Sequence, residues 1–283
     1  AFDLLRTDTT VDTFRAAFAA TAERFDMTVD LRDLATPVPT AIMCSKQPHC
    51  LYDLLTRWRS GELPMDLRVV VPNHPDHRDI AEHMDVPFVH LPVTADTKPQ
   101  QEGQVLDALA DYGVDLVVMA RYMQILSDDF ISHYPMKIIN IHHSFLPAFI
   151  GANPYRQAHE RGVKLIGATA HYATADLDEG PIIAQDTHHV THRESVAQLT
   201  AAGRDVETTV LARAVRAHIE HRVAVHGNTT IVYSCPTSAC AALRSPRRTH
   251  EHYRHRDADH LFDASTLRTG GRHHLAPRRV RLR

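Results

Sequence analysis

The chain has 283 residues, of which 43% are hydrophobic and 23% are charged. This composition is typical of a globular protein, which excludes wholesale disorder and leaves enough apolar residues for a core. No stretch approaches the ~20 apolar residues of a membrane-spanning helix. Four cysteines without CxxC spacing exclude a disulfide framework, so we expect a reducing, cytoplasmic setting.

Charge is unevenly distributed along the chain. Residues 234–283 contain 11 arginines and four acidic residues, a net charge of +7, whereas the remaining residues carry 20 basic and 30 acidic groups, a net charge of −10. The basic segment is rich in histidine and has no periodicity, so we predict a disordered tail. It lacks the aromatic ladder of a specific nucleic-acid site, and its histidines suit only adventitious metal binding.

Residues 1–34 have the pattern of a small α+β module. Phe14, Phe18 and Phe25 recur at helical spacing, which predicts a helix with these rings in a core. Residues 27–34 alternate like a strand. The two prolines of segment 35–40 indicate a linker.

Residues 41–233 alternate between apolar strands and helices. Short strands are predicted at 41–45, 67–73, 88–93, 114–120 and 137–141, and longer or terminal strands at 163–173, 181–190, 222–227 and 228–234. Helices are predicted at 49–61, 102–113 and 194–221. Continuous Val and Ile runs between helices predict an α/β fold with an open, mostly parallel, Rossmann-like sheet covered on both faces.

Polar residues mark the end of the strand at 137–141. Asn140 and His142 are two residues apart and can project the same way, at the carboxyl end of a strand, where ligands bind in such sheets. Asp178 lies in a later loop. An amide donor, a histidine and a carboxylate suit addition to an acyl carbonyl. The spacing alone leaves a second interpretation open, in which Asn140 caps a chain reversal and His142 fills a half-buried surface.

Longer motifs add a family resemblance. They are NIHHSFLPAF, GANPY, GATAHY and LDEGPII, together with SKQPHCLYDLLTRWRSGELP, LPVT and ARYMQILS. In this order they resemble the formyltetrahydrofolate hydrolase (deformylase) family, over about residues 1–233. The resemblance implies a formyltransferase-fold domain at 41–233 and an N-terminal ACT domain, of which residues 1–34 correspond to the last part. It also implies a homo-oligomer that hydrolyses 10-formyltetrahydrofolate to formate and tetrahydrofolate, supplying formate for purine synthesis.

The resemblance also implies the site residues. The catalytic Asn, His and Asp of the family fall on Asn140, His142 and Asp178, with His143 and His171 in supporting positions. Contacts to the folate ring, mostly from the main chain, are implied at Tyr122, Met123, Leu126, Thr174, Asp176 and Leu177. Neither a metal nor a separate cofactor is expected, because folate is the substrate.

The segment Ser45–Cys50 bears on the acyl acceptor. Related glycinamide ribonucleotide formyltransferases hold a phosphate in a glycine-rich loop, but this segment contains no glycine, and Pro48 lacks an N–H. We therefore expect water as the acceptor. The alternatives are a formyltransferase with an amine acceptor, a non-catalytic folate-binding or regulatory protein, and a nucleic-acid binder that uses residues 234–283.

Overall fold

The computed structural model describes residues 10–27, 29, 31–146 and 154–234, together with two short strands at 2–3 and 279–281. The chain divides into two units, one of Thr36–Ser234 and one of Ala1–Ala35 with Cys235–Arg283. Among the described residues, no helix has both the length and the apolar character needed to cross a membrane.

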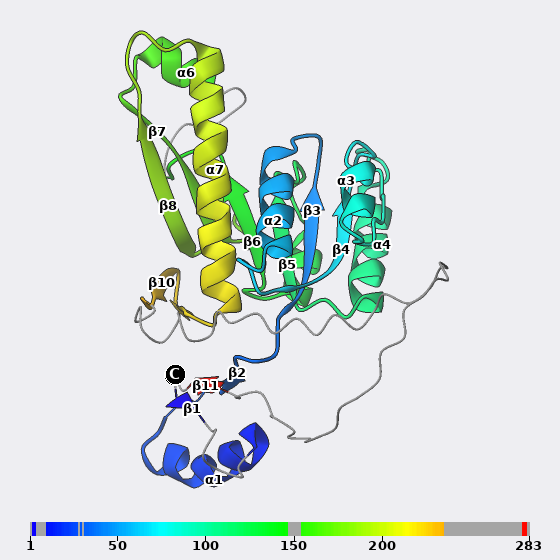
Figure 1. Ribbon diagram of the computed structural model, residues 1–283, viewed down its shortest axis with the longest axis vertical. Coiled ribbons are helices and arrows are strands. Elements are labelled where there is room, and N and C mark those ends of the chain that lie inside the picture. Colours follow the sequence, from blue (N-terminus) through cyan, green and yellow to red (C-terminus); the bar gives the residue numbers. More distant parts are fainter. Residues whose placement is uncertain are drawn as a thin grey trace, which may run out of the picture. The chain divides into compact units, whose positions relative to one another are not determined.

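The larger unit is built on a six-stranded sheet (Figure 1). Its strands are β3 (Pro39–Cys44), β4 (Asp66–Pro72), β5 (Leu116–Ala120), β6 (Ile138–His142), β7 (Leu165–Tyr172) and β8 (Ile182–His189). They lie in the order β4-β3-β5-β6-β7-β8, in which the first four are parallel and the β6/β7 and β7/β8 pairs are antiparallel. The predicted open, mostly parallel α/β sheet is confirmed, and β6 is where its parallel and antiparallel parts meet.

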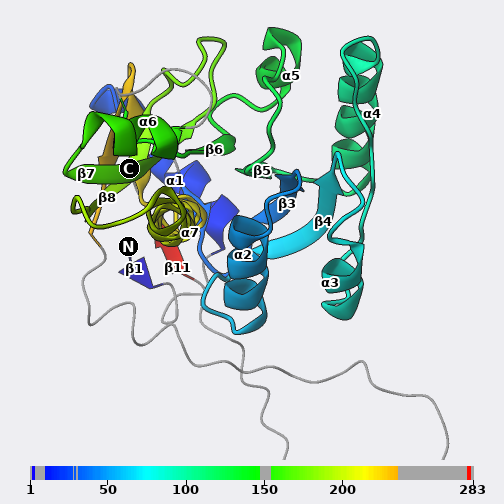
Figure 2. The same cartoon turned by 90° about the horizontal axis from the view of Figure 1, so that it is seen from above.

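Helices cover both faces of this sheet (Figure 2). They are α2 (His49–Arg59), α3 (Arg78–His83), α4 (Lys98–Asp111), α5 (Asp128–His133), α6 (Pro154–Arg161) and α7 (Val196–Ile219). Ile139 and Ile141 of β6 pack in the hydrophobic cluster that contains α2 and α7, whereas Ile138 packs with α4 and α5. Alternate residues of a strand face opposite sides, so Asn140 and His142 share the side of Ile138.

The end of the larger unit follows its sequence pattern. A capping box starts α7: the Ser195 hydroxyl accepts from the Gln198 N–H, and the Gln198 side chain accepts from the Ser195 N–H. After α7 the chain forms a separate antiparallel hairpin of β9 (Val223–His226) and β10 (Thr229–Val232), which matches the two predicted end strands.

The strand predicted at residues 88–93 is wrong. The structure has a single isolated bridge there, between Phe88 and Val70, and two further N–H groups of the segment donate to carbonyl groups of β4. The donors are Val89 and Leu91, at alternate positions as in a strand, but the pairing does not extend into a regular ladder. The segment runs beside β4 as an extended loop.

The smaller unit contains helix α1 (Val11–Arg24), which is capped by the Thr10 hydroxyl. Its strands β1 (Phe2–Asp3), β2 (Arg32–Asp33) and β11 (Arg279–Arg281) pair antiparallel in the order β1-β11-β2. Of the residues in the strand expected at 27–34 that the structure describes, only those of β2 are in a strand. We predicted disorder for residues 234–283. Apart from Ser234 and β11, these residues lie outside the part of the chain that the structure describes.

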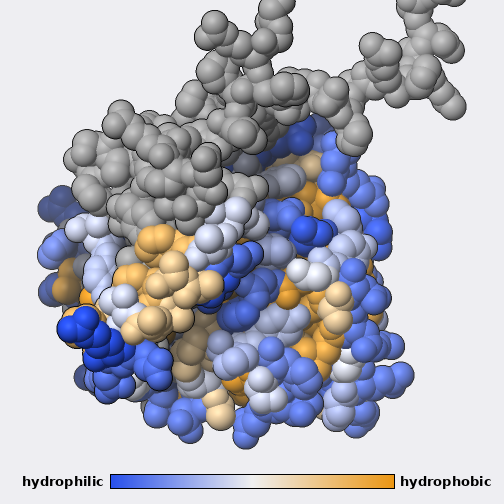
Figure 3. Space-filling view, turned by 90° about the horizontal axis from the view of Figure 1, so that it is seen from below, coloured by the Kyte–Doolittle hydropathy of each residue, from blue (hydrophilic) through white to orange (hydrophobic). Residues whose placement is uncertain are grey.

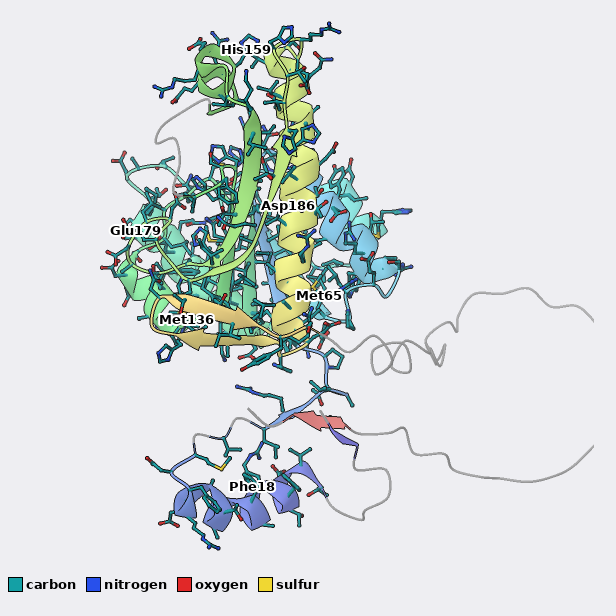
Figure 4. All side chains as sticks on the ribbon, turned by 90° about the vertical axis from the view of Figure 1, so that its left-hand side faces the viewer. Phe18, Met65, Met136, His159, Glu179 and Asp186 are labelled. Atoms are coloured by element: carbon teal, nitrogen blue, oxygen red, sulfur yellow. The ribbon has the colours of Figure 1, made fainter. Side chains whose placement is uncertain are left out.

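The aromatic core predicted for α1 is partly wrong. The rings of Phe14 and Phe18 stack at 5.8 Å, and both side chains are half-buried (Figure 4 labels Phe18). Phe25, however, is 62% exposed. It is the C-cap residue, where the chain leaves helical geometry and the helical spacing no longer directs its side chain. The Arg24 guanidinium lies over its ring instead.

Candidate active site

Asn140 of β6 lies directly opposite His171 of β7 in the antiparallel pair. The amide Nδ2 of Asn140 is 3.2 Å from Nε2 of His171, and Nδ1 of His171 is 3.0 Å from the Tyr172 carbonyl oxygen. Because a carbonyl only accepts, Nδ1 of His171 carries a hydrogen. In the neutral ring, Nε2 therefore accepts from the Asn140 amide.

Asp178 joins two histidines from the loop between β7 and β8. One carboxylate oxygen lies 3.1 Å from Nδ1 of His142, and the other lies 3.5 Å from Nε2 of His171. Asp178 has a φ of +57°, in the left-handed region that Asp tolerates better than most residues. The structure thus brings together Asn140, His142, His171 and Asp178, as the sequence predicted.

Gly180 allows this loop to close tightly. The Tyr172 N–H donates to the Pro181 carbonyl at 3.0 Å, so the two ends of the loop meet. A Cβ on Gly180 would lie only 1.8 Å from the Tyr172 carbonyl oxygen, a position that no side chain can occupy. The path of the backbone beside Asp178 therefore requires glycine.

The electrostatics of the site favour a charged Asp178 and a neutral His143. Hydrogen bonds donated by His142 and, when its ring is protonated at both nitrogens, by His171 hold the pKa of the Asp178 carboxyl well below its usual range. Burial lowers the pKa of His143 to about 4, and the positive charge of Arg121 acts in the same direction. The His143 ring lies beside that of His142, with 5.0 Å between their centroids.

One ring atom of His142 is left for a bound molecule. Nδ1 faces Asp178, whereas Nε2 is buried without a hydrogen-bond partner among the described residues. Buried ring nitrogens of this kind are normally satisfied by a partner. Since His142 also lines the cleft described next, a ligand in that cleft can supply the missing partner.

These side chains line a cleft of about 1090 Å³, large enough for a small-molecule ligand. Among the predicted folate contacts, the cleft is lined by Tyr122, Met123, Leu126, Thr174 and Leu177. Asp176 is exposed and not among the lining residues; its carbonyl oxygen accepts from the Thr174 hydroxyl at 3.1 Å. Met123 and Leu177 are more than half exposed. One face of the molecule is mostly hydrophilic and carries several hydrophobic patches (Figure 3).

The sequence and fold place the chain among known proteins. Residues 39–215 match the family model described as formyl transferase. The formyltetrahydrofolate deformylase of Bacillus subtilis (strain 168) is 52% identical over 220 residues, which cover 78% of this chain and 73% of the relative. The chain belongs to the formyl transferase family.

Within this family the most similar proteins reported are deformylases. The formyltetrahydrofolate deformylase of Synechocystis sp. is 50% identical over 82% of this chain and 84% of the relative. The crystal structure of formyltetrahydrofolate deformylase from Burkholderia mallei superposes with a TM-score of 0.77 at 54% identity, covering 81% of each chain. Glycinamide ribonucleotide transformylase 1 from Symbiobacterium toebii has a TM-score of 0.66 at 30% identity, covering 70% of this chain and 95% of that one. The resemblance expected from the sequence motifs is confirmed.

A second polar cluster, which the sequence analysis missed, surrounds Glu207 on α7. Glu207 is 1% exposed; one oxygen lies 2.8 Å from Nε2 of His49 and 3.4 Å from Nε of Arg121, and the other accepts from the Tyr155 hydroxyl at 2.7 Å. Gly203 makes room for this hydroxyl, since a Cβ there would lie 2.1 Å from it. His49 and Glu207 are 158 residues apart in sequence, so no local pattern could have revealed the cluster.

The same cluster contains the described side chains best placed to hold a metal ion. Ligand atoms of His49, Cys50 and Glu207 lie within 4.8 Å of one another. Burial, however, raises the pKa of the Cys50 thiol well above its usual value, and Arg121 places a positive charge beside the carboxylate. Cysteine binds a divalent cation in its thiolate form, which the raised pKa disfavours here. The positive charge of the Arg121 side chain would also repel the ion. We therefore assign no metal centre to this cluster.

Proposed function

We propose that this chain hydrolyses 10-formyltetrahydrofolate to formate and tetrahydrofolate, which supplies formate for purine synthesis. The observation that carries the proposal is the contact of Asp178 with both His142 and His171, beside the Asn140 amide, in the wall of the cleft. This set supplies a carboxylate and hydrogen-bond donors around one point, as addition of water to a formyl carbon requires. The relatives named formyltetrahydrofolate deformylase support the same substrate.

Asn140 and His142 are the proposed donors to the formyl oxygen. When water adds to the formyl carbon, that oxygen becomes an oxyanion. The Asn140 amide directs one hydrogen to His171 and has a second to offer. Nδ1 of His142 faces the Asp178 carboxylate, which stabilises the imidazolium form of the ring. In that form Nε2 carries a hydrogen and can donate it to the oxyanion. Donors of this kind each contribute about 10²–10³-fold in rate.

Asp178 is the proposed group that orients the attacking water and accepts its proton. Its low pKa is consistent with a carboxylate that is always ionised when substrate binds. The C–O bond to water forms as the proton moves to Asp178, the C–N10 bond then breaks, and N10 takes that proton. The formic acid released ionises to formate. His171 holds Asn140 and Asp178 in register, and neutral His143 is a second polar group near the water.

Water is the proposed acceptor because segment 45–50 is engaged within the protein. The Ser45 hydroxyl accepts from the Met123 N–H at 3.0 Å. The carbonyl oxygens of Ser45 and Lys46 lie 3.1 and 3.2 Å from Nε2 of His77. Without glycine, and with Pro48 before α2, the segment does not form the backbone cradle that a phosphorylated acceptor needs.

The folate ring is proposed to bind between two loops of the cleft. The Met123 backbone is held by Ser45, and the Tyr122 hydroxyl is held by Nε2 of Gln101 at 2.8 Å, so the first loop is well supported. Backbone groups of these loops can pair with the amide-like edge of the ring. The proposed contacts are Tyr122, Met123, Leu126, Thr174, Asp176 and Leu177, with Asp176 contributing its main chain.

Three further properties complete the proposal. Cys44 and Cys50 are free thiols, which supports a reducing, cytoplasmic setting. The reaction above uses side chains alone, so we expect no metal or separate cofactor, and EDTA should leave the rate unchanged. We also expect a homo-oligomer, which light scattering of the purified chain measures.

A formate-release assay tests the function directly. The purified chain is incubated with 10-formyltetrahydrofolate, with and without glycinamide ribonucleotide. We expect formate in both cases and at the same rate. Formyl transfer that depends on the ribonucleotide would instead identify a transferase, and tight folate binding without formate would identify a non-catalytic binder.

A further inference from the structure

The β9–β10 hairpin contacts the loop that carries Asp178. The Asn228 side-chain Nδ2 donates to the Glu179 carbonyl oxygen at 2.9 Å, and the Thr230 hydroxyl donates to the Ile182 carbonyl oxygen. These two acceptor residues lie on either side of Gly180 and Pro181, where the loop closes. The hairpin lies after residue 215, where the match to the family model ends. An element outside that match therefore supports the loop (Figure 4 labels Glu179).

The turn of this hairpin places the Asn228 amide. Thr229 pairs with His226, which leaves Gly227 and Asn228 as a two-residue turn. Gly227 has a φ of +56°, as expected for the first central residue of a type II′ turn. Such a turn is short and regular, so Asn228 projects from a fixed position. Asn228 also lines the cleft, beside Asp178.

The Asp178 loop needs external support of this kind. The left-handed backbone of Asp178 costs about 1–2 kcal/mol relative to an ordinary conformation. The bond between Tyr172 and Pro181 closes the base of the loop but does not reach its tip. The Asn228 amide holds the Glu179–Gly180 peptide, one residue beyond Asp178, and so restrains the part of the loop that carries the carboxylate.

We infer that Asn228 is a positioning residue that holds the Asp178 carboxylate against His142 and His171. The inference rests on the proposed hydrolysis for its kinetic consequence. Asn228 need not touch the substrate to act, since its amide is already committed to the Glu179 carbonyl. Without that hydrogen bond the tip of the loop is free to move, and the two contacts of Asp178 lengthen.

The inference has a consequence for pH dependence. Asp178 is faced by His142 from β6 and His171 from β7, with His143 at longer range and Glu179 next to it on the loop. The contacts with the two histidines keep the pKa of Asp178 low, so longer contacts raise it. Loss of the Asn228 hydrogen bond should therefore raise the pKa of the Asp178 carboxyl.

The experiment compares Asn228→Ala and Asn228→Asp with Thr229→Ala. The aspartate keeps the shape of asparagine but has no amide to donate. Thr229 lies in the same hairpin, and its hydroxyl donates to the His226 carbonyl, away from the Asp178 loop. We expect both Asn228 variants to lose about tenfold in kcat, with KM changed less than about twofold. Thr229→Ala should match the unmodified chain.

A second measurement does not depend on activity. The imidazole ¹⁵N signals of His142 and His171 report the contact with Asp178, and they should shift in Asn228→Ala but not in Thr229→Ala. Unchanged imidazole signals in Asn228→Ala, or an equal loss of kcat in Thr229→Ala, would overturn the positioning role. Formate release by the unmodified chain tests the proposed hydrolysis separately from the role of Asn228. If the unmodified chain releases no formate, the proposed function is contradicted. If Asn228→Ala has normal kinetics, only the role of Asn228 is contradicted.

Discussion

Asn140 and His171 are direct cross-strand partners, and their side chains are 3.2 Å apart. The pairing is a consequence of the antiparallel register of β6 and β7, so two strands of the sheet, rather than loops, set the position of the amide. His171 then reaches Asp178 with the same ring nitrogen. The rigid part of the candidate site is therefore continuous with the sheet.

Replacing Asn140 with alanine removes the proposed donor to the oxyanion. We expect kcat to fall by about 10²–10³-fold, while folate binding changes little, because the stabilised charge exists only in the transition state. Steady-state formate release gives kcat, and quenching of intrinsic fluorescence gives folate affinity. A decrease in affinity as large as the decrease in kcat would contradict this role.

Asp178→Asn removes the carboxylate with little change in shape. Asparagine tolerates the left-handed φ of this position as well as aspartate does, so we expect the variant to fold. Formate release should fall by at least about 10²-fold, since neither the base nor the partner of the His142 imidazolium remains. Normal hydrolysis by a folded Asp178→Asn variant would exclude Asp178 as the base.

His143 should remain neutral across the ordinary range of pH. Its pKa in the folded chain is lowered to about 4, below the value of about 6.5 for an exposed histidine. Between these two pH values the unfolded chain binds more protons at this position, so the free energy of unfolding decreases as pH falls through this window. Denaturant unfolding from pH 7 to pH 4 measures the slope. His143→Asn should reduce it, and an NMR titration that finds an ordinary pKa for His143 would contradict the prediction.

Two glycine-to-alanine changes should have opposite effects. At Gly180 the new Cβ would clash with the Tyr172 carbonyl, so Gly180→Ala must displace the Asp178 loop and lower both stability and formate release. At Gly103, within α4, nothing lies within 4 Å of a Cβ and the backbone is helical. Gly103→Ala should stabilise the chain by about 0.5–1 kcal/mol and leave the rate unchanged. Thermal unfolding and the formate assay distinguish the two results.

Glu207→Ala should destabilise the fold strongly. The substitution leaves Arg121 and His49 without their buried carboxylate partner, at a cost of about 3–5 kcal/mol. The exposed Glu160 on α6 provides a matched control, and Glu160→Ala should change the free energy of unfolding by less than about 0.5 kcal/mol. Denaturant unfolding compares the two. Equal effects would show that the Glu207 cluster contributes little to stability.

Sequence patterns predicted the sheet and the shared face of Asn140 and His142 because both depend on local signals. Val and Ile runs identify buried strands, and the spacing of Asn140 and His142 places them on one face of β6. The approach of Asp178 could be inferred only from the family motif, because the loop closure at Gly180 is a tertiary feature.

Other features had no local signal. The segment 88–93 has the apolar pattern of a strand, but it forms a single isolated bridge with β4 instead of a regular ladder. The partners of Glu207 come from separate helices and a strand end, and none is near it in sequence. The contact of Asn228 with Glu179 likewise joins two turns that only the folded chain brings together. Long-range polar contacts of this kind do not follow from periodicity or composition.

The position of β6 within the sheet also limits how a ligand can be recognised. β5 pairs with one edge of this strand at residues 138–140 and β7 with the other at residues 139–142, so neither edge is open along its length. A bound molecule cannot add itself to β6 as an extra strand. Its heterocyclic edge must instead exchange hydrogen bonds with the main chain of the surrounding loops, and chemical selectivity can vary through those loops while the reacting groups on the strand stay in place.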